Sequence, residues 1–185
     1  DSALLSDPTA SRTRAFVKIQ DGCDNHCSYC VVTIARGAQR SRSVANILAE
    51  IGDRVAEGYK EVVLTGVHIG SFGGDTSGGQ SDLAALIDTI LDRTAVERLR
   101  LSSIEPWDFD PHMLSLWENP RLCRQMHLPL QSGCDSTLKR MNRRYSVDGY
   151  RKLIASARER IPGLAVTTDI IVGFPGEDEQ EFAES

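Results

Sequence analysis

The sequence has no long apolar run and few of the residues that dominate fibrous or disordered chains. In 185 residues, no stretch approaches the roughly 18 consecutive apolar residues of a membrane-spanning helix. Only 7 prolines and 15 glycines are present and 41% of the residues are apolar, which excludes a collagen-like or disordered chain. We therefore expect a globular protein with no membrane partner.

The amino-terminal end lacks the features of a secretory signal. Residues 1–14 contain no basic stretch followed by an apolar one, and the chain does not begin with Met. We expect residues 1–14 to be the remnant of a linker and residues 15–185 to form one core domain.

Acidic residues are missing from one segment and concentrated in another. Between positions 25 and 49 the only charged residues are Arg36, Arg40 and Arg42. The net charge is −5, but residues 176–185 hold five acidic residues and no basic one, so the rest of the chain balances. A second basic cluster follows at residues 139–144. Such patches are compatible with a nucleic-acid partner, although solvated surface charge explains each arginine alone.

A disulfide framework is also excluded. The cysteine count is five, an odd number, and Cys23, Cys27 and Cys30 lie within eight residues. This usage indicates a reducing compartment, so we expect a cytoplasmic protein. Cys123 and Cys134 stand apart, and we interpret them as small packing residues rather than ligands.

Apolar runs rich in β-branched residues alternate with segments of helical periodicity. We expect strands at residues 15–19, 61–65, 99–104, 125–130 and 165–174. The second and fifth are nearly continuous apolar runs, which predicts burial on both faces. Helices are expected after Ser43, Ser81 and Ser146, with a shorter one at residues 111–117 and a flexible glycine-rich loop at 70–81.

Strands joined by helical crossovers form a parallel sheet, so the fold class is α/β. The sheet is either open and doubly wound or curled into a partial (β/α) barrel, because about five β-α units cannot close an eight-stranded one. The chain ends inside the helix after the fifth strand, so we expect the core to be incomplete there. Functional residues of such sheets gather at the carboxyl ends of the strands.

The first strand is followed by three cysteines with the spacing C-x₃-C-x₂-C. Three thiolates suit three corners of a [4Fe–4S] cluster and leave the fourth iron open to another ligand. A structural zinc site needs four ligands, and no second pair of the usual kind follows. A zinc site, inert thiols and a redox pair of Cys27 and Cys30 remain as alternatives.

The cysteine loop, with an aromatic residue before its last cysteine, resembles the signature of radical S-adenosylmethionine enzymes. Several segments of this sequence resemble, in order and spacing, the central domain of the methylthiotransferases. They are IQDGCDNHCSYC, ARGAQRSR, SSIEP, HLPLQSG, LKRMNRRY and DIIVGFPGE. The segment LTGVHIGSFG at residues 64–73 looks like the branch that modifies N6-threonylcarbamoyladenosine in tRNA. The resemblance covers nearly the whole chain. It implies a partial (β/α) barrel of the radical-SAM type.

The resemblance also implies cofactors and their ligands. The cysteines would bind a [4Fe–4S] cluster, and its open iron would bind S-adenosylmethionine, which is cleaved to a 5′-deoxyadenosyl radical. Backbone at the end of the second strand and polar or small residues at the ends of the later strands would hold this cofactor. The positions that match are Tyr29, Thr65, Gly66, Ser103, Glu105, Gln131 and Gly173. The family's usual double glycine is absent at Thr65. Ordinary packing would explain Tyr29, and a helix cap before Pro106 would explain Ser103 and Glu105.

The partner implied by the resemblance is the anticodon stem-loop of tRNA, with an electron-donor protein. Arg36, Arg40 and Arg42 would then contact RNA phosphates at the mouth of the barrel. Complete methylthiotransferases also have an amino-terminal domain with a second [4Fe–4S] cluster and a carboxyl-terminal RNA-binding domain, and neither matches this sequence. The alternatives are isopentenyladenosine in tRNA or a ribosomal protein as substrate, and a zinc-stabilised RNA-binding module without catalysis.

Overall fold

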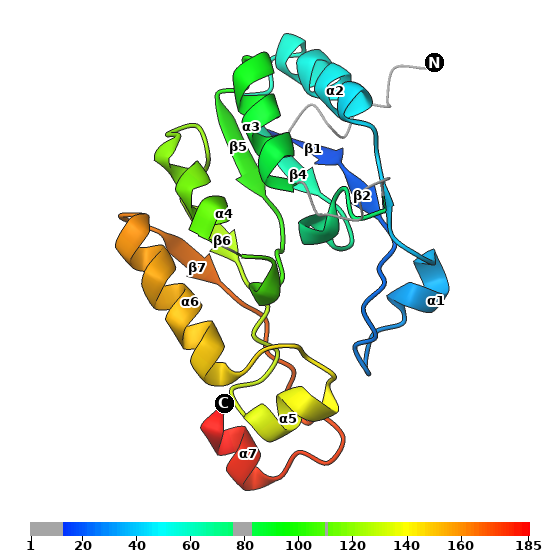
Figure 1. The fold of residues 1–185 in the computed structure, drawn as a ribbon, viewed down its shortest axis with the longest axis vertical. Helices are drawn as coiled ribbons and strands as arrows, with labels where there is room; N and C mark the ends of the chain where they lie inside the picture. Colours follow the sequence, from blue (N-terminus) through cyan, green and yellow to red (C-terminus); the bar gives the residue numbers. More distant parts are fainter. Residues whose placement is uncertain (1–12, 76–82, 110) are drawn as a thin grey trace, which may run out of the picture.

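Five parallel strands lie in series and form the core of the fold (Figure 1). The computed structural model describes residues 13–75, 83–109 and 111–185. Strands β1 (Arg14–Lys18), β4 (Glu61–Thr65) and β5 (Arg98–Leu101) form one sheet in the order β1-β4-β5, and β6 (Gln125–His127) pairs with β7 (Ala165–Thr167). Isolated parallel bridges, one from Ser103 to His127, join β5 to the second sheet. The described strands thus form an open, partial barrel, and the predicted α/β class is confirmed.

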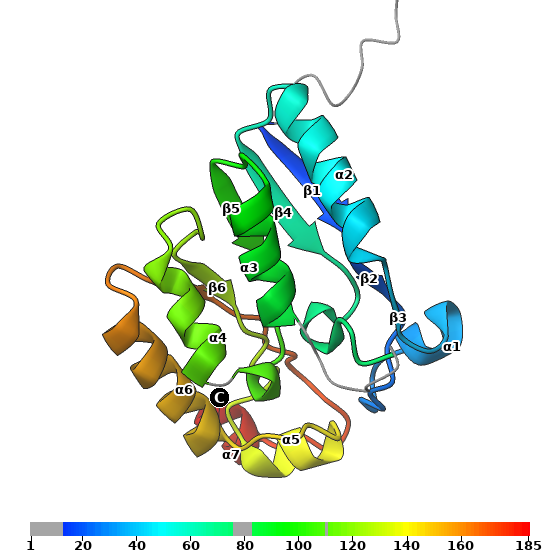
Figure 2. The ribbon, with the colours of Figure 1, turned by 45° about the horizontal axis from the view of Figure 1, so that its top comes forward.

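The crossover helices lie along one side of this series (Figure 2). They are α2 (Val44–Ala56), α3 (Leu83–Arg93), α4 (Pro111–Ser115) and α6 (Val147–Arg160). The expected caps of α2 and α6 are present: Ser43 accepts the Asn46 N–H, and Ser146 accepts the Gly149 N–H. The third expected cap, Ser81, lies outside the described residues, as does part of the expected loop at 70–81.

The main core fills the space between the strands and these helices. Val62 and Leu64 of β4 are fully buried, as the continuous apolar run predicts, because β4 is the central strand of its sheet and these side chains lie in one core with residues of α2 and α3. Ile47 and Ile51 of α2 pack against the same core on one stripe of the helix. This core fixes the positions of the strand ends, where the candidate residues lie.

The fifth strand is shorter and more exposed than expected. The sequence predicts a strand at residues 165–174 buried on both faces, but β7 ends at Thr167, and Ile170 and Val172 are exposed. Strand β7 lies at the edge of the series, and among the described strands it pairs only with β6, so its other edge has no partner strand. The expectation of a doubly covered strand was therefore wrong.

Several short elements were not expected from the sequence. They are strands β2 (Gln20–Asp21) and β3 (Arg40–Ser41), helices α1 (Val32–Arg36) and α5 (Asp135–Arg140), and the 3-10 turns Ile69–Ser71 and Pro106–Asp108. Helix α7 (Glu179–Glu184) is the helix expected after the fifth strand, and the 3-10 turn Leu116–Glu118 overlaps the end of the short helix expected at residues 111–117. Among the described residues, no helix has the length and apolar character required to cross a membrane.

Candidate active site

The loop with the three cysteines begins at a glycine that no other residue can replace without strain. Gly22 follows β2 with φ 72°, and a Cβ atom there would collide with the carbonyl oxygen of Ala38. The turn is completed by the Cys23 N–H, which donates to Gly37 O over 3.1 Å, and by the Cys30 N–H, which donates to Cys27 O over 3.0 Å. The chain thus turns sharply from the sheet into the cysteine loop.

The three cysteines open into one cavity of about 190 Å³ at the carboxyl ends of the strands. Cys23 and Cys27 are half-buried and Cys30 is exposed. Within the described residues, no three His, Cys, Asp or Glu side chains converge closely enough to hold a single metal ion. Twelve residues line the cavity: Cys23, Asn25, Cys27, Tyr29, Cys30, Val32, Thr33, Val67, His68, Glu105, Gln131 and Arg143.

A buried histidine lies beside the first cysteine. His68 Nε2 is 2.8 Å from Asp108 Oδ2, and His68 Nδ1 is 3.2 Å from Asn25 Nδ2. Burial alone would lower the pKa of His68, but Asp108 and Cys23 together raise it to about 9. Burial likewise opposes ionisation of Cys23, yet the hydrogen bonds of His68 and the Asn25 N–H lower the pKa of this thiol. Cys23 is therefore biased toward the thiolate, the form that binds metals.

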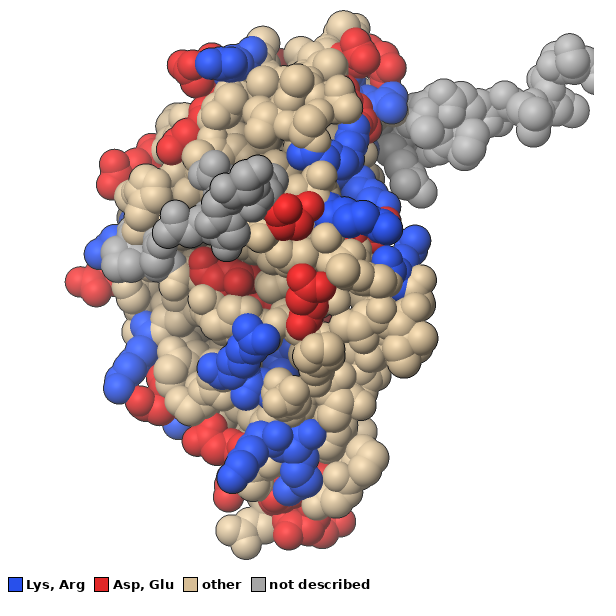
Figure 3. All heavy atoms as spheres, turned by 45° about the vertical axis from the view of Figure 1, so that its right-hand side comes forward, with Lys and Arg blue, Asp and Glu red and all other residues tan. Residues whose placement is uncertain are grey.

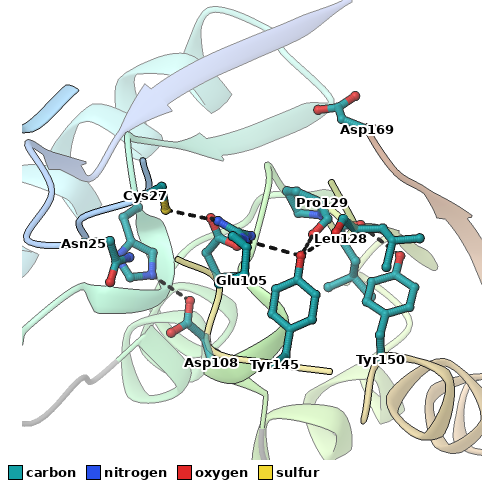
Figure 4. A network of polar contacts seen from close by, with 12 residues as sticks. Asn25, Cys27, Glu105, Asp108, Leu128, Pro129, Tyr145, Tyr150 and Asp169 are labelled. Carbon is teal, nitrogen blue, oxygen red and sulfur yellow. Dashed lines mark hydrogen bonds and ion pairs between the residues drawn. The ribbon is translucent and has the colours of Figure 1, made fainter. Parts of the chain in front are cut away.

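A buried arginine joins the second cysteine to Glu105. Arg143 Nη1 lies 3.3 Å from Cys27 Sγ and 3.3 Å from Glu105 Oε1, and Nη2 forms an ion pair with the same carboxylate. Figure 4 shows Cys27, Glu105 and Tyr145 joined by dashed lines in one polar network. Glu105 directly precedes a 3-10 turn but makes no capping hydrogen bond with its side chain. The Glu105 carboxylate instead forms the ion pair with Arg143.

Three of the other candidate cofactor residues lie at the cavity and four do not. Tyr29, Glu105 and Gln131 line it. The Tyr29 ring contacts Phe174 edge to face with centroids 6.4 Å apart, and burial raises the pKa of its hydroxyl. Gln131 adopts φ 66°, while its backbone bridges to Ile170.

The four that lie elsewhere are Thr65, Gly66, Ser103 and Gly173. The Thr65 carbonyl accepts the Ile19 N–H over 2.8 Å and so belongs to the sheet. Gly66 is packed so closely that a Cβ would lie 2.8 Å from the Gln20 carbonyl oxygen. Ser103 forms the bridge to β6, and Gly173 lines a separate hollow beside α7.

The three arginines proposed for RNA follow the cysteine loop but differ in their contacts. Arg42 forms an ion pair with Glu50 over 2.7 Å and also donates to the Lys18 carbonyl. Arg36 ends α1, and its carbonyl oxygen accepts from Arg40 Nη2 over 3.4 Å. Within the described part of the chain, neither Arg36 nor Arg40 forms an ion pair. Figure 3 shows basic side chains in several groups on this side of the molecule, with acidic ones between them.

Sequence reasoning missed three residues of the cavity wall that carry polar or close contacts: Asn25, Val67 and Arg143. Asn25 lies within the quoted cysteine motif and was not singled out. Val67 and His68 directly follow Gly66, and their N–H groups donate to Gln20 Oε1 over 3.1 and 2.8 Å. Arg143 belongs to a basic cluster, and such clusters normally lie at the surface.

The open series of parallel strands, with three cysteines at the carboxyl edge, defines an α/β enzyme of the partial-barrel type. The profile of the Radical SAM superfamily matches residues 17–185. The chain belongs to the radical SAM superfamily.

Curated relatives agree with the predicted resemblance. Threonylcarbamoyladenosine tRNA methylthiotransferase MtaB of Thermotoga maritima is 42% identical over 173 residues, which are 92% of this chain and 39% of the relative. The tRNA-2-methylthio-N(6)-dimethylallyladenosine synthase of Staphylococcus aureus is 40% identical over 173 residues, which are 93% of this chain and 34% of the relative. The chain thus spans well under half the length of these relatives.

Solved structures support the fold. The radical S-adenosylmethionine methyltransferase TsrM of Kitasatospora setae matches with a TM-score of 0.71 at 20% identity, over 91% of this chain and 32% of that one. Methylornithine synthase PylB matches with a TM-score of 0.62 at 16% identity, over 93% of this chain and 48% of that one. The comparisons confirm the predicted enzyme class, its [4Fe–4S] and S-adenosylmethionine cofactors and the similarity to tRNA methylthiotransferases.

Proposed function

We propose that the protein is a tRNA methylthiotransferase that adds a methylthio group to C2 of the N6-threonylcarbamoyladenosine next to the anticodon. The observation that carries the proposal is the cavity that Cys23, Cys27 and Cys30 share with Glu105 and Gln131. The names of the two relatives support tRNA as the substrate class. Because the chain spans 39% and 34% of those relatives, the proposal concerns the protein in which this domain acts.

The donor set fits an iron–sulfur cluster. Thiolates are soft ligands that suit such clusters, and these three face one cavity without converging on a single point. When bound, the cluster supplies the electron that cleaves the sulfonium of S-adenosylmethionine to give the 5′-deoxyadenosyl radical. Cys23, Cys27 and Cys30 would hold the cluster, and the neighbours of Cys23 already lower the pKa of its thiol.

The remaining wall of the cavity has the groups needed to hold S-adenosylmethionine. Glu105 offers an anionic acceptor for ammonium or ribose hydroxyl groups, and Gln131 offers an amide on the neighbouring strand end. Tyr29 supplies an aromatic edge beside the last cysteine. Thr65, Gly66, Ser103 and Gly173 do not line this cavity. For them we retain the contacts that the family resemblance implies: backbone contacts at Thr65 and Gly66, a hydroxyl hydrogen bond at Ser103 and close backbone approach at Gly173.

The choice of N6-threonylcarbamoyladenosine over the dimethylallyl nucleoside rests on the polarity of an adjoining hollow. This hollow measures about 300 Å³ and shares Asn25 and His68 with the cysteine cavity. Its wall includes Gln39, Ser71 and Trp107, so it offers hydrogen bonds and one aromatic face. A polar threonylcarbamoyl group has partners there, whereas a dimethylallyl group would bury polar groups without hydrogen bonds.

The experiment compares substrates after anaerobic reconstitution with iron and sulfide. The protein is incubated with S-adenosylmethionine, a reductant, a sulfur source and tRNA bearing either modified nucleoside, and digests are examined by mass spectrometry. We expect 5′-deoxyadenosine and a methylthio group on the threonylcarbamoyl nucleoside. A methylthio group found only on the dimethylallyl nucleoside, or on a ribosomal protein, would show that the proposed substrate is wrong. Stoichiometric zinc without iron would overturn the proposal that the protein is a radical enzyme.

A further inference from the structure

Arg143 is almost completely enclosed although it belongs to a basic cluster. Its side chain is 1% exposed. The guanidinium carbon lies 4.7 Å from the ring centroid of Trp107 and 5.2 Å from that of Tyr145, and Arg143 Nε lies 3.3 Å from the Tyr145 hydroxyl. The charge therefore lies against two neighbouring aromatic rings, away from bulk water.

The chain around Arg143 also grips the cysteine loop. The Ser28 N–H donates to Met141 O over 3.1 Å, and the Ser28 hydroxyl donates to Arg140 O over 2.8 Å. Asn142 Nδ2 donates to His26 O over 2.7 Å. These contacts join segments about 115 residues apart, on both sides of Cys27. They fix the guanidinium 3.3 Å from the Cys27 sulfur.

We propose that Arg143 is a positioning residue that sets the electron affinity of the cluster through its hydrogen bond to the Cys27 thiolate. The inference rests on the proposed function, because it requires the cluster at the three cysteines. Reduction adds a negative charge to a cluster, and hydrogen bonds to the ligand sulfurs and nearby charges change its potential. A fixed positive charge beside one ligand sulfur favours the reduced form.

Glu105 opposes this effect. Its carboxylate pairs with the guanidinium and shares Nη1 with the Cys27 sulfur, and so neutralises part of the positive charge that Cys27 experiences. Burial would lower the pKa of Arg143, but the Glu105 carboxylate raises it, so the guanidinium stays charged. Arg143 and Glu105 should therefore shift the potential in opposite directions when each loses its charge.

The test measures the midpoint potential of the reconstituted cluster by redox titration with electron paramagnetic resonance detection, without S-adenosylmethionine. We expect R143Q to disfavour the reduced cluster on the order of tenfold at fixed potential, about 59 mV more negative for a one-electron couple. E105Q should move the potential in the positive direction. R143K retains a positive charge and should stay closer to the unmodified protein than R143Q does.

The adjacent Arg144 provides the control. It is exposed and contacts Trp107 only distantly, with its guanidinium carbon 5.9 Å from the ring centroid, so R144Q should leave the potential unchanged. If R143Q does not assemble a cluster, E105Q decides: a positive shift supports the proposal and an unchanged potential overturns it. Equal potentials in the unmodified protein, R143Q and E105Q would overturn the role of Arg143 alone. A protein that assembles no cluster at all would instead overturn the proposed function together with this inference.

Discussion

The three thiols of the cavity lie in different electrostatic surroundings. Cys23 Sγ accepts the Asn25 N–H over 3.4 Å and lies next to His68. Cys27 faces the guanidinium of Arg143, and Cys30 is exposed. Two of the three sulfurs thus have a hydrogen-bond donor beside them. These differences arise from residues far apart in the sequence and converge only in the folded chain.

Replacement of one cysteine of the motif should abolish cluster assembly. We expect Cys27→Ser to lose the cluster after anaerobic reconstitution, because two thiolates cannot replace three corners of the cube. The matched control is Cys134→Ser, since Cys134 is buried, contacts Ser136 Oγ over 3.2 Å and does not line the cavity. Iron and sulfide content provide the measurement. Equal iron in both variants would contradict the assignment of the ligands.

Gly22 allows a test of the loop geometry. Gly22→Ala forces an L-residue into positive φ, which costs about 1–2 kcal/mol, and also drives its Cβ into the Ala38 carbonyl. Gly163 has a similar φ of 75° but open space around it, so Gly163→Ala is the control for the backbone strain alone. We expect both variants to lose stability by thermal unfolding and only Gly22→Ala to lose iron. Full iron loading of Gly22→Ala would show that the turn does not position the cysteines.

At the scale of the elements, the charged network at the amino-terminal end of β4 stabilises the sheet at the edge opposite the cysteines. Glu61 has a side chain only 8% exposed and forms ion pairs with Arg14, Arg98 and Arg100, at 2.8, 2.9 and 2.6 Å. These arginines come from β1 and β5, the two neighbours of β4. Residues at this edge of such sheets contribute to stability rather than to chemistry.

Neutralising Glu61 should therefore destabilise the fold without emptying the site. We expect Glu61→Gln to lower the free energy of unfolding by about 2 kcal/mol, because a hydrogen-bonded buried charge is lost. Burial would raise the pKa of Glu61, but the arginines lower it overall. Its contribution is thus complete above the ordinary glutamate pKa and disappears as the pH falls through the lowered value.

Chemical denaturation between neutral and acidic pH measures this effect. The control is Glu97→Gln, since Glu97 pairs with Lys60 while both side chains are more than half exposed. If the Glu61→Gln protein is as stable as the Glu97→Gln protein at neutral pH, the ion pairs of Glu61 do not stabilise the fold.

Element boundaries were predictable where burial follows from local sequence. The bounds of β4 agree with its continuous apolar run, and α2 begins after its predicted serine cap. The prediction of a long fifth strand buried on both faces was wrong, because the apolar sequence does not reveal that β7 lies at an edge of the sheet. Spacing alone identified the cysteine trio. The burial of Arg143 was not predictable, because its partners Cys27 and Glu105 are 116 and 38 residues away.

At the scale of the whole molecule, the acidic tail neutralises part of the second basic cluster, at residues 139–144, rather than the arginines that follow the cysteine loop. Glu181 of α7 forms an ion pair with Arg140 of α5, and Arg140, supported by Ser136, lowers the pKa of this carboxyl to about 2. The net charge of −5 thus does not describe the side that carries α1. Arg36 and Arg40 lie on this side and form no ion pair among the described residues.

These two arginines should contribute to tRNA binding through phosphates. We expect Arg36→Gln with Arg40→Gln to weaken tRNA binding and to reduce the slope of log affinity against log salt by about 2, one for each lost contact. Arg42→Gln should have a smaller effect, because Glu50 already neutralises this arginine. Arg158→Gln on α6 is the control. An unchanged salt slope in the double variant would remove Arg36 and Arg40 from the interface.

The most direct measurement is electron paramagnetic resonance of the reduced protein, reconstituted without oxygen, before and after addition of S-adenosylmethionine. The account expects four irons and four sulfides held by Cys23, Cys27 and Cys30, with a spectrum that changes when S-adenosylmethionine binds the open iron. A spectrum that does not change when S-adenosylmethionine is added, or a protein that retains zinc and no iron, would contradict this assignment of the site.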